Sequence, residues 1–269
     1  MNTYIFLHIP KTAGTSLRKI VERFYKEKDI YRIYTREHGF NDMNDFLALP
    51  DDEKRKIKVI YGHLSFGIHQ YLPQSSSYVT LLRNPVDRII SLFHHVSNDS
   101  NHPNYARIKN EGLSIGQFVS KGVATAFEAD NHQTRIMSGE FPEHGKCTSK
   151  MLDRAKDNIR DRFAIVGLTE YFMETVLLMK NILGWETTLY HNISNLFNRG
   201  KRNQFNIKTN VSVDRIKKED LHEDDANTIL EFNALDMELY RFAETLFHEQ
   251  VNKQGARFKK ELEEIKAGM

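Results

Sequence analysis

The chain has 269 residues, of which 40% are hydrophobic and 28% charged, and its formal net charge at pH 7 is +2. This length predicts a well-buried globular core, and the near-neutral charge gives no reason to expect nucleic acid or a membrane surface as a partner. The single cysteine, Cys147, excludes an intramolecular disulfide, and its surroundings do not mark it as a nucleophile.

The first ten residues, MNTYIFLHIP, are typical of a strand and contain neither a basic leader nor an apolar stretch of membrane length. We therefore expect no membrane span and a cytoplasmic location. A fragment of a lumenal protein stays open as the alternative, because a given sequence can lack its leader.

Hydrophobic periodicity predicts strands that alternate with helices. Apolar runs indicate buried strands at 4–9, 56–63, 77–83 and 162–171, with a short fifth strand at 187–194. Amphipathic helices are expected after the first, third and fourth of these runs, and Leu17, Ile20, Val21 and Phe24 form the apolar face of the first helix. We expect loops and one short helix (42–49) over 26–56, and mostly helix over 98–160 and after 218.

This alternation predicts an α/β fold of the P-loop-like, three-layer kind, with a central, mostly parallel sheet of four to five strands flanked by helices. We expect one domain over residues 1–269, in which 250–269 form a charged, solvated helical tail. Ligands of such sheets bind beyond the carboxyl ends of the strands. The loop at 10–16, His63 and Arg83 each lie at the carboxyl end of a predicted strand, so we expect them at one crevice.

The loop in FLHIPKTAGTSLRKIV is suited to hold an anion, because backbone N–H groups at a helix N-terminus attract negative charge. Lys11 adds a positive charge, Thr12, Thr15 and Ser16 add hydroxyl groups, and Gly14 permits a close approach of the backbone. The loop departs from the Walker A pattern, since its lysine precedes its only glycine. The alternative is a tight turn with a solvated lysine.

A second candidate segment is LLRNPVDRIISLF, in which Asn84 is a good helix N-cap and Pro85 suits the first helical position. Arg83 ends the strand, and Ser91 follows it by eight residues on the helix. An arginine fork with a hydroxyl group suits a terminal phosphate. The alternative is that Arg83 pairs with Asp87 and that Ser91 is buried.

HIPKTAGTS followed by LLRNPVDRIISLF resembles the sulfotransferases that use 3′-phosphoadenosine 5′-phosphosulfate (PAPS), in particular their carbohydrate branch with heparan sulfate 2-O-sulfotransferase. The resemblance implies that the first loop holds the 5′-phosphosulfate and that Arg83 and Ser91 hold the 3′-phosphate. Softer matches lie at 131–139, 166–176 and 233–243. The residues matched in the first loop are Lys11, Thr12, Gly14, Thr15 and Ser16, and Ala13 lies among them.

The resemblance also implies the chemistry. His63, in YGHLSFGIH, corresponds to the base that takes the proton of the acceptor hydroxyl, while a histidine that merely caps a strand end is the alternative. His69 is the second choice for the base and is also expected to contact the acceptor, and His8 is expected to be structural. Lys11 stabilises the charge on the departing 3′-phosphoadenosine 5′-phosphate (PAP), for which the residues 12–16 supply backbone amides.

Two further assignments concern basic residues outside these motifs. The basic loop at 197–206 could close over the nucleotide with Arg199, Lys201 and Arg202. Arg135 could contact an anionic acceptor, with a structural salt bridge as the alternative. No sequence pattern indicates a metal site.

The sequence therefore predicts sulfuryl transfer from PAPS to a hydroxyl of an acceptor, with a glycan preferred to a lipid or small molecule. A P-loop nucleotide or small-molecule kinase is the alternative enzyme, although the Walker lysine and a magnesium-binding aspartate are not evident. A nucleotide-binding scaffold without activity is the non-enzymatic alternative. The sequence leaves the acceptor and the oligomeric state open.

Overall fold

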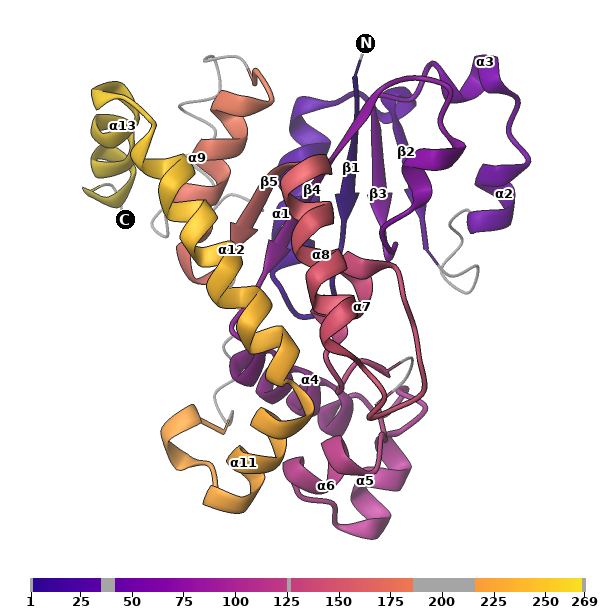
Figure 1. The fold of residues 1–269 in the computed structure, drawn as a ribbon, viewed down its shortest axis with the longest axis vertical. Coiled ribbons are helices and arrows are strands. Elements are labelled where there is room, and N and C mark those ends of the chain that lie inside the picture. The colour runs from indigo at the N-terminus through magenta and orange to yellow at the C-terminus, as the bar shows by residue number, and fades with distance from the viewer. Residues whose placement is uncertain (1, 35–41, 125–126, 186–215, 268–269) are drawn as a thin grey trace.

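The computed structural model describes residues 2–34, 42–124, 127–185 and 216–267. Its centre is a five-stranded sheet in the order β2-β3-β1-β4-β5, and every neighbouring pair of strands is parallel. The predicted α/β fold with a parallel sheet is therefore confirmed (Figure 1). The strands are β1 (Thr3–Leu7), β2 (Ile30–Ile33), β3 (Val59–Gly62), β4 (Ser76–Leu82) and β5 (Phe163–Leu168).

Helices cover both faces of the sheet. The connection from β1 to β2 runs across the sheet in one direction and that from β4 to β5 in the other, so right-handed crossovers place α1 (Gly14–Phe24) and α8 (Ser149–Arg162) on opposite faces. Helix α8 shares its face with α7 (His132–Ser138) and the long α12 (Ala234–Asn252) (Figure 1). On the other face, Phe24 at the end of α1 stacks on Trp185, which follows α9 (Phe172–Ile182), with 4.0 Å between ring centroids.

Strand β2 was not predicted. Its four residues, IYRI, stand at the edge of the sheet, and three of them are only partly buried. A short edge strand lacks the continuous apolar run of a strand with both faces covered. The described residues in the rest of the 26–56 region include three short helices, of which α2 (Met43–Leu47) was expected. The other two are η1 (Glu27–Asp29) and α3 (Asp51–Lys54).

The prediction of a solvated C-terminal tail was wrong. Helix α13 (Ala256–Ala267) buries Phe258 and Ile265, which are 2% and 3% exposed, in the main hydrophobic core. Lys180 of α9 also pairs with Glu261 at 2.9 Å. The apolar residues Phe258, Leu262 and Ile265 recur every three to four positions along an otherwise charged helix, so only one narrow stripe of α13 carries its packing.

A second hydrophobic cluster lies below the carboxyl ends of the strands (Figure 1). It is built around α4 (Pro85–Asn98), whose predicted N-cap is confirmed: the Asn84 side chain accepts hydrogen bonds from the Val86 and Asp87 amides. The other helices of this region are α5 (Tyr105–Glu111), α6 (Ile115–Ser120) and α11 (Glu223–Phe232). Within the described residues, no helix is both long enough and apolar enough to cross a bilayer.

Short 3₁₀ helices are the remaining described elements. The expected strand at 187–194 lies outside the described residues. Within the described ranges, the 3₁₀ helices after β2 are η3 (Ile68–Tyr71), η5 (Thr169–Tyr171) and η7 (Lys218–Asp220). Because β1 and β4 are parallel, the loop after β1 and the start of α4 both lie at the carboxyl edge of the sheet, where the sequence predicts the ligand.

Candidate functional site

The loop between β1 and α1 has an unusual backbone. Lys11 and Ala13 adopt positive φ angles of 70° and 65°, although neither is glycine. Such conformations are rare for residues with a side chain and are found where function requires them. Ala13 is the N-cap of α1 and cannot cap it with its side chain. The amides of Gly14 and Thr15, in the first turn, are among those that no helix satisfies internally.

The loop rests against buried groups of neighbouring strands. Gly14 is buried, and a Cβ atom at this position would lie 1.8 Å from Cδ2 of His8, so no larger residue fits without moving that ring. The Tyr61 hydroxyl on β3 donates a hydrogen bond of 2.5 Å to the Gly14 carbonyl. These contacts fix the start of α1 and leave its first amides at the edge of the sheet.

The hydroxyl groups of the loop are not equivalent. Thr12 is 1% exposed, and its Oγ1 donates to the Ile9 carbonyl at 2.9 Å. Its side chain thus holds the loop, and only its amide could serve a ligand. Thr15 is exposed, and Ser16 is partly exposed in the first turn of α1.

Arg83 connects the two candidate segments. It follows β4, which extends beyond the end of β1: Thr80 pairs with Leu7, the last residue of β1, and two more residues of β4 follow. From this position Nη1 of Arg83 donates a hydrogen bond of 3.0 Å to the Lys11 carbonyl. Ser91 lies half-buried in the second turn of α4. The lysine loop and the arginine segment are therefore one continuous surface.

Three rings stand in a row at the same edge. Leu7, Gly62 and Ile33 end three neighbouring strands in register, so His8, His63 and Tyr34, which follow them, lie side by side. The His63 ring centroid is 4.7 Å from that of His8 and 4.9 Å from that of Tyr34.

The three rings differ in their surroundings. His63 is exposed, whereas His8 is largely enclosed, and burial together with the charges of His63, Arg18 and Lys11 lowers the pKa of His8 to about 3. Burial raises the pKa of Tyr34 to about 12. His8 and Tyr34 are therefore both uncharged near neutral pH, and they form an uncharged wall beside the exposed imidazole of His63.

A cavity of about 740 Å³ opens beside His63. Its wall is rich in aromatic and apolar side chains and includes Ile33, Tyr34, Met43, His63, Phe66 and Tyr71. Tyr71 is 49% exposed, which is high for a large side chain. Tyr34 was not foreseen, because the strand that positions it was not predicted.

Two expected contact residues lie elsewhere. The Nδ1 atom of His69 is 2.7 Å from the hydroxyl of Tyr78, which lies early in β4, so His69 is held over the face of the sheet and is not among the cavity residues. Arg135 is fully buried and pairs with Asp130, which favours the salt-bridge alternative. Arg199, Lys201 and Arg202 lie outside the described residues. Burial raises the pKa of the Cys147 thiol to about 12, as expected for an inert cysteine.

The strand order and the basic strand–loop–helix at the carboxyl edge define a P-loop-like α/β protein. The sequence profile of the galactose-3-O-sulfotransferase family matches residues 1–268. The chain therefore belongs to the galactose-3-O-sulfotransferase family, and the resemblance to carbohydrate sulfotransferases is confirmed.

Individual relatives agree with this family. Human galactose-3-O-sulfotransferase 3 is 26% identical over 196 residues, which cover 68% of this chain and 45% of the relative. Mouse heparan sulfate 2-O-sulfotransferase 1 is 22% identical over 287 residues, covering 92% of this chain and 77% of the relative. The chain thus spans about half the length of the galactose-specific relatives. A crystal structure of mouse sulfotransferase SULT7A1 complexed with PAP covers 94% of this chain and 89% of its own, with 15% identity and a TM-score of 0.44.

Proposed function

We propose that the protein transfers a sulfuryl group from PAPS to a hydroxyl group of a carbohydrate. The observation that carries this proposal is the hydrogen bond of 3.0 Å from Arg83 to the Lys11 carbonyl, which joins two segments that are far apart in the sequence. A donor with phosphate groups at both the 5′ and the 3′ position needs such a two-part site. Membership in the sulfotransferase family supports the same assignment.

The residues at the edge fit a nucleotide of this kind. Lys11, the amides of residues 12–15 and the hydroxyls of Thr15 and Ser16 offer donors and positive charge for the 5′ end, whereas the Ser16 amide donates to the Ala13 carbonyl at 3.0 Å. Arg83 and Ser91 offer a guanidinium fork and a hydroxyl for the 3′-phosphate. When bound, PAPS supplies the sulfuryl group. In this proposal Lys11 places a positive charge where negative charge develops on the leaving oxygen.

His63 takes the acceptor proton in this proposal. It is exposed at the wall of the cavity, whereas the lowered pKa of His8 makes that neighbour a poor base near neutral pH. The two histidines therefore have different roles in this proposal. His8 packs against Gly14 and supports the imidazole of His63, and His63 accepts the proton of the hydroxyl group.

The cavity suits a sugar as the acceptor. Aromatic rings such as Tyr34, Phe66 and Tyr71 can pack against the apolar face of a sugar, while its hydroxyl groups reach polar groups nearby. The family and the printed names of several relatives make the 3-hydroxyl of galactose the first acceptor to test. A single domain and a cytoplasmic location stay predictions from the sequence alone.

The test is transfer of radiolabelled sulfate from PAPS to a panel of acceptors in the presence of a metal chelator. The panel contains galactose-terminated oligosaccharides, heparan fragments, lipid alcohols and phenols. We expect label in a carbohydrate and none in the lipid or phenol samples. Labelling of a non-carbohydrate alone would contradict the acceptor class, and magnesium-dependent transfer of phosphate from ATP would favour the kinase alternative instead.

A further inference from the structure

The backbone at Arg83 and Asn84 is held by side chains from distant parts of the chain. Gln133 of α7 binds Arg83 twice: its Oε1 accepts from the Arg83 amide and its Nε2 donates to the Arg83 carbonyl, both at 2.9 Å. The amide of Asn84 donates to Oε1 of Glu170 at 2.8 Å. These residues follow the last residue of β4, so no strand partner fixes this part of the backbone.

Gln133 is itself held in place by a residue of another helix. It is fully buried, and Asp236 of α12 accepts hydrogen bonds from the amides of Gln133 at 3.0 Å and Thr134 at 2.7 Å. The carboxylate therefore caps the N-terminus of α7 from another helix. Arg88 contributes favourable charge to Asp236 from α4.

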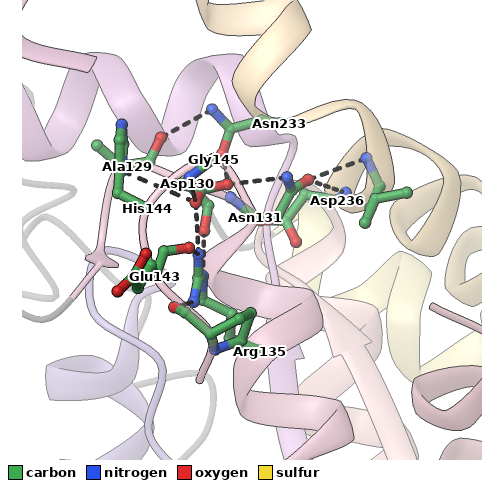
Figure 2. Close-up of polar contacts among 11 residues, drawn as sticks. Ala129, Asp130, Asn131, Arg135, Glu143, His144, Gly145, Asn233 and Asp236 are labelled. Atoms are coloured by element: carbon green, nitrogen blue, oxygen red, sulfur yellow. Dashed lines mark hydrogen bonds and ion pairs between the residues drawn. The ribbon is translucent and has the colours of Figure 1, made fainter. Parts of the chain in front are cut away.

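The capping is reciprocal. Asn131, just before α7, accepts hydrogen bonds from the amides of Leu235 at 2.9 Å and Asp236 at 3.0 Å, which begin α12. Asn131 adopts a positive φ of 44° to do so, and Asn233 accepts from its amide at 3.2 Å. Figure 2 shows Asn131, Asn233 and Asp236 together, above the ion pair of Arg135 with Asp130. Two helix N-termini are thus joined through buried polar groups.

Glu170 is fixed in a similar way. Its Oε2 accepts a hydrogen bond of 3.0 Å from the hydroxyl of Tyr240, in the second turn of α12. Thr169, the preceding residue, donates to the Leu82 carbonyl at 3.0 Å. The segments that hold Arg83 and Asn84 are therefore the three that the sequence marks as softer family matches: 131–139, 166–176 and 233–243.

We propose that Gln133 is a positioning residue for Arg83, held in place by Asp236 across the paired starts of α7 and α12. This rests on the proposed function, in which the Arg83 guanidinium binds the 3′-phosphate. Two hydrogen bonds to one residue fix the peptide planes on either side of its Cα atom. Gln133 thereby sets the direction in which the Arg83 side chain leaves the end of β4 and reaches the Lys11 carbonyl.

The test compares the affinities of PAP and adenosine 5′-phosphate, which differ only in the 3′-phosphate, in wild type and in Gln133→Met, Arg83→Ala and the double variant. The quantity compared is the ratio of the affinity for PAP to the affinity for adenosine 5′-phosphate. This ratio is insensitive to any loss of folded protein and to any effect on the shared part of the nucleotide. We expect Arg83→Ala to lower the ratio about 10- to 100-fold. Gln133→Met should lower it about five- to tenfold, and the double variant should be no worse than Arg83→Ala.

Gln74→Met is the matched control. Gln74 also bonds to the backbone with its side chain, to the Lys54 carbonyl at 2.6 Å, and it precedes β4 at the opposite edge of the sheet. This variant should leave the ratio unchanged. If Gln133→Met does not fold, Gln133→Asn serves the same comparison, since its shorter side chain cannot reach both backbone groups of Arg83.

Hydrogen exchange gives a second readout without nucleotide. Gln133→Met should speed exchange of the Arg83 amide, and Gln74→Met should not. An unchanged PAP ratio in Gln133→Met with a lowered ratio in Arg83→Ala would overturn the positioning role and leave the proposed function standing. An unchanged ratio in both variants would overturn both, because Arg83 would then not bind the 3′-phosphate.

Discussion

Arginine and histidine occur in two contrasting settings, the open edge of the sheet and the buried network behind it. Arg83 is half-exposed and turned toward the Lys11 loop, whereas Arg135 is fully buried and bonds to Asp130 and to the carbonyls of Pro142 at 2.5 Å and Glu143 at 3.2 Å. The guanidinium of Arg83 lies at the carboxyl edge beside the Lys11 loop, whereas that of Arg135 bonds to groups inside the fold.

The histidines show the same contrast. His63 is exposed beside the cavity, whereas His132, the first residue of α7, is 4% exposed, and burial together with Arg88 and Arg135 lowers its pKa well below the usual value. Residue type alone therefore does not identify the site. Residues of the candidate site follow a strand at the carboxyl edge of the sheet. Residues of the buried network belong to helices that pack against a face of the sheet.

The largest expected effect is on turnover at the open edge. Replacing His63 with Ala removes the group that takes the acceptor proton, and we expect kcat to fall about 10²- to 10⁴-fold. The affinity for PAP, measured by calorimetry, should change little. The matched variant is His69→Ala, which should retain most activity because His69 bonds to Tyr78 away from the cavity wall. Unchanged turnover in His63→Ala would refute the assignment of the base.

The next effect is on stability and belongs to the buried network. Arg135→Ala leaves the carboxylate of Asp130 buried without its main partner, so we expect a loss of about 3–5 kcal/mol in the free energy of unfolding. Denaturant titration measures it. Arg83→Ala is the comparison and should lose less than about 1 kcal/mol, because a partly exposed arginine contributes little to stability. Equal losses in the two variants would remove the distinction between the regions.

Gly14 tests whether the two histidines are coupled to the loop. In Gly14→Ala the new methyl group overlaps the ring of His8, and relieving this overlap should cost about 1–3 kcal/mol of stability. The displaced His8 ring should also disturb His63, which lies 4.7 Å away between centroids, so kcat should fall as well. Thermal unfolding and kinetics measure both effects. Wild-type values for both would mean that the His8 ring moves aside freely.

The effect that is smallest at neutral pH is a pH dependence of stability. The pKa of His8 is about 3 in the folded protein and near its ordinary value of 6.5 when unfolded, because burial disfavours its charge. The unfolded state therefore binds more protons below pH 6.5, and stability present above that pH is lost as the pH falls. Compared with His8→Gln, the wild type should lose up to about 1.4 kcal/mol more per pH unit between pH 6 and 4. Parallel stability curves for the two proteins would contradict the burial of His8.

Much of the site can be predicted from the sequence because it depends on strand ends. A polar residue directly after an apolar run marks the carboxyl edge, and this pattern correctly places Lys11, His63 and Arg83 together. Tyr34 was not predicted in this way, because it follows a short edge strand with little apolar pattern.

The buried network could not be predicted, because it consists of contacts over long distances in the sequence. Gln133 is 50 residues from Arg83, and Asp236 is 103 residues from Gln133. The hydrophobic periodicity of a sequence gives no information about contacts between residues so far apart in the chain. Only the family resemblance of the segments around them signalled that these residues matter, and it led to Arg135, which faces the interior, in place of Gln133.

The central claim is that the Lys11 loop and Arg83 form one site for a nucleotide with phosphates at both ends. The most direct measurement is calorimetric binding of PAP and of adenosine 5′-phosphate to the wild-type protein in a metal chelator. We predict that PAP binds at least about tenfold more tightly, because only PAP carries a group for the Arg83 fork. Equal affinity for the two nucleotides, or binding that requires magnesium, would contradict the claim.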